Sequence, residues 1–136
     1  MKKSVLIAGL LGTFACHADD HPVDVAEQHC LQSAVTTLAM QQCYSTASRD
    51  WESEMNKAYT NLMSRLNGTQ KAKLRSAQRA WLKYRDGWLE ASKARLSEGG
   101  TLASVEVAAQ GVNLVKNQTL ALKSLAAAGC ANPDDC

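Results

Sequence analysis

Carboxylates are the residues of this chain that could perform acid–base chemistry. Glycoside hydrolysis needs two carboxyl groups held several ångströms apart, one of them to protonate the leaving oxygen. Four carboxylates lie in the central part of the chain: Glu52, Glu54, Asp86 and Glu90. Their spacing marks no pair as catalytic, and the available histidines lie near the N-terminus, so no Ser-His-Asp or Cys-His arrangement can be argued. We therefore predict that the protein is not an enzyme and uses no cofactor.

Cysteines offer a second kind of chemistry, disulfide formation. Cys16 lies in a segment that we expect to be removed, which leaves Cys30, Cys43, Cys130 and Cys136. An even number of cysteines in a secreted chain is typical of disulfides, and four cysteines allow three pairings. The short separations favour Cys30–Cys43 and Cys130–Cys136. A metal site is the alternative, but the ligand spacing of a zinc site is absent, so we predict no metal.

Cations are concentrated in the segment 65–95. Nine Lys or Arg residues face only two carboxylates there, which gives the segment a charge of +7. A solvated helix face accounts for most such charge runs. The functional alternative is a surface for an acidic partner, in which Arg79 and Lys83 would be contact residues. Nucleic acid is not expected as a partner, because no nucleic-acid-binding motif is present.

Aromatic residues follow helical spacing in the same segment. Ala77, Trp81, Tyr84 and Trp88 are separated by four, three and four residues, which places them on one face of a helix. Such a stripe is more often core than surface, and we predict that Trp81 is buried. Trp88 follows Gly87 in mid-helix and is our candidate for an exposed contact residue, because Trp and Tyr are enriched in interface hot spots. The predicted partner-binding residues are thus Arg79, Lys83 and Trp88.

Three long helices must position these residues. The first begins at Thr36 or Thr37 and carries an apolar seam with steps of three and four residues until Asn67-Gly68. Thr69 and Thr101 are the expected N-caps of the second and third helices. Short turns between three amphipathic helices predict an all-α, antiparallel bundle. Residues 19–35 are expected to form a looser lead segment, pinned to the first helix by Cys30–Cys43.

The N-terminus has the pattern of a secretory signal peptide. A basic start is followed by an apolar run too short to span a bilayer and by small residues at the cleavage positions, which predicts cleavage after Ala18. Phe14 makes Cys16 a poor lipid-attachment site, so we do not expect a lipoprotein. No other apolar run is long enough for a transmembrane span. We predict a periplasmic or secreted bacterial protein with a helical domain at 36–128 and a cystine-closed tail at 129–136.

Removal of residues 1–18 also changes the charge balance. The full chain has 15 Lys and Arg against 13 Asp and Glu, and Lys2 and Lys3 leave with the signal peptide, so 15 − 2 leaves 13 against 13. A neutral total offers no whole-protein attraction for nucleic acid.

The chain resembles the lysozyme inhibitor LprI N-terminal domain family. The resemblance rests on Cys30 and Cys43, on the first long helix from Trp51 to Leu66, and on the string Ala-Gln-Arg-Ala-Trp-Leu-Lys-Tyr-Arg-Asp at 77–86. It covers about residues 30–126 and implies a small, secreted, helical protein that binds lysozyme. Members commonly carry two further cysteines that join the last two helices, whereas 87–89 and 110–112 contain none here.

Two functions follow as hypotheses. The first is a periplasmic protein that binds and blocks a lysozyme or another wall hydrolase. The second is a non-inhibitory adaptor that binds an envelope protein or an anionic glycan.

Overall fold

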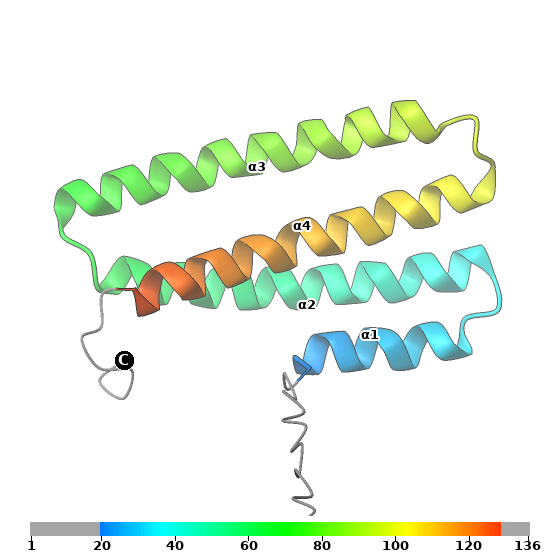
Figure 1. Cartoon of the computed structure of the whole chain (residues 1–136), viewed down its shortest axis with the longest axis horizontal. Helices are drawn as coiled ribbons and strands as arrows, with labels where there is room; N and C mark the ends of the chain where they lie inside the picture. Colours follow the sequence, from blue (N-terminus) through cyan, green and yellow to red (C-terminus); the bar gives the residue numbers. More distant parts are fainter. Residues whose placement is uncertain (1–19, 129–136) are drawn as a thin grey trace, which may run out of the picture.

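The computed structural model describes residues 20–128, which form four helices and no strand in that range (Figure 1). The helices are α1 (Pro22–Ser33), α2 (Thr37–Ser64), α3 (Gly68–Leu96) and α4 (Thr101–Ala127). The all-α prediction is confirmed, but the number of three helices is wrong, because the lead segment contains α1. The signal peptide at 1–18 and the predicted Cys130–Cys136 bridge lie outside the described residues.

Local signals explain why α1 forms although no residue in it is fully buried. The His21 imidazole caps the helix, since its Nδ1 accepts a hydrogen bond from the Val23 N–H at 3.3 Å. Pro22 occupies the first turn, where its missing N–H costs nothing. The predicted Cys30–Cys43 disulfide is confirmed, with 5.6 Å between the Cα atoms, and it pins α1 to α2.

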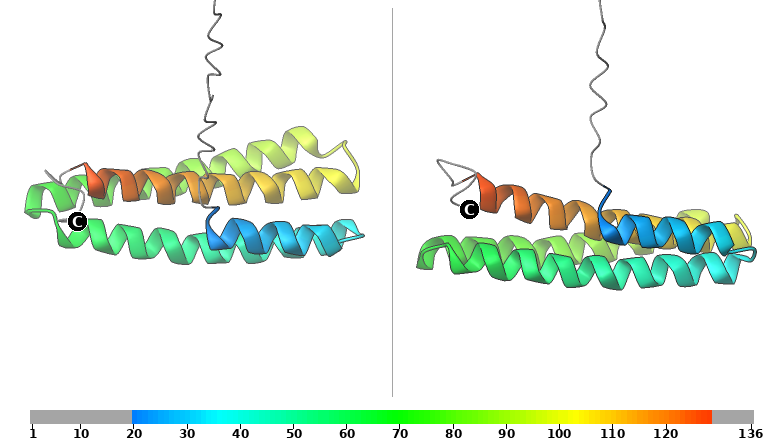
Figure 2. Two further views of the ribbon diagram at one scale, coloured as in Figure 1. Left: turned by 60° about the horizontal axis from the view of Figure 1, so that its bottom comes forward. Right: turned by 90° about the horizontal axis from the view of Figure 1, so that it is seen from below.

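The core lies between α2 and α4. Residues at steps of three and four turn inward from α2, namely Cys43, Ala47, Trp51, Met55, Ala58 and Leu62. They meet Val112, Val115, Thr119 and Leu122 of α4. Successive helices reverse direction as predicted, but α2 and α4, which make the main contact, run parallel (Figures 1 and 2). They do so because α3, which joins them in the sequence, runs back along the outer side of α4.

The helix ends follow cap chemistry. Thr36 caps α2 by accepting a hydrogen bond from the Ala39 N–H at 3.1 Å. The cap of α3 is Asn67 and not Thr69, because Asn67 and Gln70 form a reciprocal capping box. The cap of α4 is Gly100 and not Thr101, because the chain turns there at a φ of +68°, which glycine adopts without strain. Within 20–128, no helix is long and apolar enough to cross a membrane.

Candidate protein-binding surface

Helix α3 lies outside the core pair and contacts chiefly α4 (Figure 1). Leu74, near its start, is its only fully buried residue. In the same way, α4 has no fully buried residue before Val112. Helices α3 and α4 therefore contribute buried residues only in the half of the bundle that holds the α2–α3 turn. In the half that holds the α1–α2 and α3–α4 turns, the buried residues Cys43 and Ala47 come from α2.

Trp81 and Arg85 hold the middle of α3 against the core. Trp81 is half-buried and packs against the core cluster, so the prediction of a core position is confirmed only in part. The Arg85 guanidinium lies 5.5 Å from the centre of the Trp81 ring. It also pairs with Glu52 of α2 at 3.2 Å and with Asp86 at 2.9 Å. This ion pair bridges α2 and α3 where apolar contact between them is sparse.

The aromatic flank of α3, which we define as Ala77, Tyr84, Trp88 and Ala91, is exposed. Ala77 and Tyr84 were expected in the core stripe, and that expectation is wrong, whereas Trp88 was our candidate for an exposed residue and is exposed. The face of α3 that turns inward is centred on Gln78, Arg85 and Leu89 instead. Tyr84 is 54% exposed and Trp88 50% exposed, with their ring centres 6.2 Å apart. Two large aromatic side chains thus stand side by side on the surface.

The Trp88 ring is held in place although it is exposed. Its Nε1–H donates to Gln110 Oε1 of α4 at 3.2 Å, and the Ser92 hydroxyl donates to the same oxygen at 2.7 Å. The adjoining groove between α3 and α4 has a volume of about 490 Å³. Its other lining residues are Ala91, Arg95, Leu96 and Glu106. The arrangement offers a fixed aromatic edge beside a shallow, mostly apolar groove.

The same contact lies where the resemblance implies a cystine that this chain lacks. The segments 87–89 and 110–112, which contain no cysteine, face each other in this structure. Trp88 and Gln110 join them by a hydrogen bond, and the Leu89 side chain lies 3.9 Å from where a Cβ on Gly111 would be. At these two segments α3 and α4 are therefore joined only by noncovalent contacts.

Arg79 and Lys83 do not share a face with Trp88. All three are exposed on α3. At about 100° per residue, Arg79 and Lys83 are about 40° apart around the helix, whereas Trp88 is about 180° from Arg79. The structure therefore brings Arg79 and Lys83 together on the outer side of α3 and leaves Trp88 on another side.

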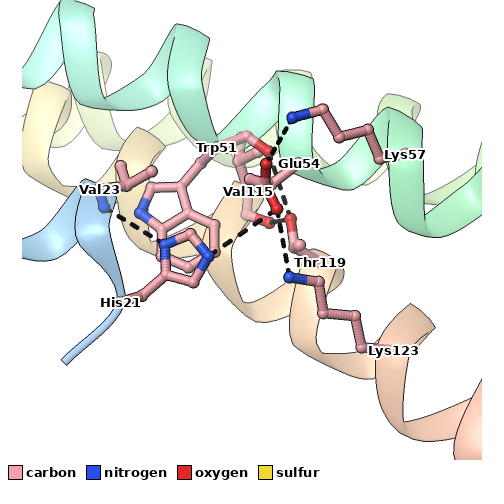
Figure 3. A network of polar contacts seen from close by, with 8 residues as sticks. All are labelled: His21, Val23, Trp51, Glu54, Lys57, Val115, Thr119 and Lys123. Atoms are coloured by element: carbon pink, nitrogen blue, oxygen red, sulfur yellow. Dashed lines mark hydrogen bonds and ion pairs between the residues drawn. The ribbon is translucent and has the colours of Figure 1, made fainter. Parts of the chain in front are cut away.

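A second polar cluster surrounds Trp51, which is fully buried (Figure 3). The His21 ring stacks on the indole with 4.3 Å between ring centres, and its Nε2 lies 3.8 Å from Glu54. Glu54 is paired with Lys57 at 2.8 Å and with Lys123 at 3.3 Å. The hydrogen bond from Lys57 lowers the pKa of Glu54 below its ordinary value, Lys123 adds to this, and burial opposes it. This network ties α1, α2 and α4 together.

The Trp51 site is built for packing. The Thr119 hydroxyl donates to the Val115 carbonyl at 2.8 Å and lies 3.4 Å from the Trp51 carbonyl (Figure 3). The Trp51 Nε1–H has no acceptor among residues 20–128. Within that range no three His, Cys, Asp or Glu side chains gather as a metal site would require.

Gln110 and Ser92, which fix Trp88, could not be found from the sequence. They are ordinary polar residues on helices, and only the packing of α3 on α4 gives them a role.

The comparisons with known proteins agree with this architecture. The sequence profile of lysozyme inhibitor LprI matches residues 30–122, which is more than half of the chain. The match contains the disulfide, the whole of α2 and α3, and α4 as far as Leu122. No curated protein and no solved structure gives a significant match. The chain therefore belongs to the LprI lysozyme inhibitor family.

Proposed function

We propose that this protein binds a lysozyme or a related wall-degrading hydrolase in the bacterial periplasm and blocks it by occupying its surface. The membership of the LprI lysozyme inhibitor family carries this proposal. On this proposal, the protein catalyses no reaction and uses no cofactor.

The aromatic flank of α3 supplies a suitable contact. Tyr and Trp are enriched among the few residues that dominate binding energy at protein interfaces. Trp88 is half-exposed and already fixed by Gln110, so little side-chain entropy remains to be lost on binding. We therefore retain Trp88 as a contact residue. Arg79 and Lys83 lie on another side of α3 and would not belong to the Trp88 contact. They would affect binding through long-range attraction or repulsion of the partner.

Location in the periplasm rests on the predicted signal peptide and on the disulfide. The tripartite pattern at 1–18 is that of an exported protein. Cys30–Cys43 requires an oxidising compartment to persist.

Calorimetric titration of the purified protein with several lysozyme classes tests this function. We expect 1:1 binding to at least one class. Trp88→Ala should weaken that binding at least about tenfold, which is the minimum for a contact worth about 1.4 kcal/mol. Leu125→Ala is the matched control, because Leu125 is an exposed apolar residue (56%) near the other end of α4. Absence of binding to every class would reject the proposal.

A second candidate is an adaptor for an anionic glycan, favoured by the charge of +7 between residues 65 and 95. Arg79 and Lys83 lie together on the outer side of α3 and would contact such a polymer. This function predicts binding to a sulfated polysaccharide that weakens steeply with salt and is lost in the double variant Arg79→Glu/Lys83→Glu. Unchanged binding in that variant would exclude these two residues.

A further inference from the structure

A hollow lined by cations lies between α2 and α4, at the end of the bundle where both helices finish (Figure 1). Its volume is about 340 Å³. Lys57, Arg65 and Lys123 line it and are exposed, whereas Ala58 is buried. The other lining residues are Asn61, Ala126 and Ala127. We call this site the cationic hollow. Its alanines leave space, and its cations surround that space with positive charge.

One carboxylate lies against these cations. Glu54 pairs with Lys57 at 2.8 Å and with Lys123 at 3.3 Å, and Figure 3 shows both side chains converging on it. Three cations and one carboxylate leave a charge of +2 at the cationic hollow. The flanking sequence offers no further compensation, because no Asp or Glu occurs at 55–85 or at 107–133. The cationic hollow therefore favours a negatively charged occupant.

The next carboxylates along the chain, Asp134 and Asp135, follow α4 directly. They belong to residues 129–136, which we call the tail and which lie outside the described residues. The tail contains no Lys, Arg or His, so its side chains bring a charge of −2. The last two residues of α4, Ala126 and Ala127, line the cationic hollow. The tail therefore leaves the described fold beside the site whose charge it complements.

The tail is long enough to reach every cation of the hollow. The six residues from Ala128 to Asp134 can span up to about 20 Å. Lys57 and Arg65 are only about 12 Å apart along the axis of α2. Lys123 lies on α4 itself, about one turn before the end of the helix. No part of the cationic hollow is thus beyond the reach of the two carboxylates.

We propose that the tail folds back over the cationic hollow and places Asp134 and Asp135 against its cations. A segment of the same chain is present at an effective concentration in the millimolar range, so it outcompetes dilute free anions. The predicted Cys130–Cys136 bridge would favour the contact. The Cα atoms of a cystine lie about 5–6 Å apart, so the bridge would hold both carboxylates close to the end of α4. The contact does not depend on the proposed function.

A docked tail would change what this end of the molecule presents to its surroundings. Cations that are neutralised by the tail attract an anionic polymer less strongly. Such a polymer would first have to displace the tail from the cationic hollow. The tail would therefore act as a built-in competitor for anionic partners at this end of α2 and α4.

Coupling with a water-soluble carbodiimide tests the contact. The reagent joins a carboxylate to an amine where the two lie together, as in an ion pair. After coupling of the purified protein, we expect peptide mapping to show amide links from Asp134 or Asp135 to Lys57 or Lys123.

Two lysines elsewhere in the bundle calibrate the coupling. Lys116 pairs with Asp24 at 2.8 Å and should be linked to it in the same sample. Lys93 lies near the opposite end of the bundle and should form no link to the tail. A linked Asp24–Lys116 pair without any link between the tail and the cationic hollow would overturn the proposal. Tail links that are as frequent at Lys93 as in the hollow would also overturn it, because the tail would then have no preferred position.

Removal of the two charges supplies an independent readout. We expect the double variant Asp134→Asn/Asp135→Asn to speed amide hydrogen exchange in the last turns of α2 and α4 at least about threefold. High salt should erase this difference, because it screens exposed charges. The matched control is Glu98→Gln/Glu106→Gln, which removes two exposed carboxylates at the opposite end and should leave exchange in these turns unchanged. Unchanged exchange in the Asp134→Asn/Asp135→Asn variant would contradict the contact.

A second copy of the chain is the rival occupant of the cationic hollow. With the protein at low micromolar concentration, we expect the coupled product to migrate as a monomer on a denaturing gel. A covalent dimer in which the tail of one copy is linked to the cationic hollow of another would show that the contact forms between copies, and would overturn the proposal.

Discussion

Truncation of Trp51 is the substitution that the fold should tolerate least. The Trp51 side chain is completely buried between α2 and α4 and carries the stacked ring of His21. Truncation of a buried aromatic residue to alanine costs about 3–5 kcal/mol, because apolar contact is lost and a cavity remains. The Nε1–H without an acceptor among residues 20–128 offsets part of this, since its removal relieves about 1–3 kcal/mol. We therefore expect Trp51→Ala to lower the free energy of unfolding by about 2 kcal/mol.

Urea denaturation followed by circular dichroism measures this loss without depending on tryptophan fluorescence. Trp88→Ala is the comparison, because Trp88 is half-exposed and should cost less than about 1 kcal/mol. Trp51→Phe keeps most of the ring and removes the unpaired donor, so its cost should stay below about 1.5 kcal/mol. A loss under about 1 kcal/mol for Trp51→Ala would refute the assignment of Trp51 as the centre of the core. A loss above about 3 kcal/mol for Trp88→Ala would show that Trp88 is structural.

Three further outcomes follow from the contacts. Removal of the Cys30–Cys43 bridge by a double serine substitution should cost about 3 kcal/mol, because the bridge closes a loop with a sequence separation of 13; equal stability in denaturant with and without the bridge would contradict this. Arg85→Met should lower stability by about 1 kcal/mol and speed amide hydrogen exchange in the second half of α3, because it removes the ion pair to α2; unchanged exchange would show that the pair does not hold α3. Glu54→Gln should destabilise the protein at neutral pH by less than about 1 kcal/mol, and the difference from wild type should vanish in acid. The reason is the lowered pKa of Glu54, whose contribution is present above the ordinary carboxyl pKa and is lost as the pH falls through the lowered value. A difference that persists at low pH would assign the effect to packing.

Periodicity was sufficient for the two core helices. The buried residues of α2 and α4 follow steps of three and four, from Cys43 to Leu62 and from Val112 to Leu122. Helix α1 could not be foreseen as a helix of its own, because its apolar residues form no stripe and its order comes from the His21 cap and the disulfide. The resemblance to the LprI family was visible in the string at 77–86.

The face of α3 shows where periodicity alone fails. Spacing groups Ala77, Tyr84 and Trp88 as a core stripe. The parallel pair of α2 and α4 already closes the core, however, so α3 rests on it through a neighbouring face that includes Arg85. The separation of Arg79 from Trp88, in contrast, was available from the sequence, because nine residues at about 100° each make two and a half turns and so place the two residues on opposite sides of the helix. The prediction grouped Arg79, Lys83 and Trp88 by charge and aromatic content and did not take helix geometry into account.

The central claim is that this chain inhibits a wall-degrading hydrolase by binding it. The most direct test is the residual activity of a lysozyme on bacterial cell walls during titration with the purified protein, which must carry the intact Cys30–Cys43 bridge. We predict that the activity of at least one lysozyme class falls linearly to near zero at a 1:1 ratio when both proteins are well above their Kd. Full activity of every class in a large molar excess of the protein would contradict the account.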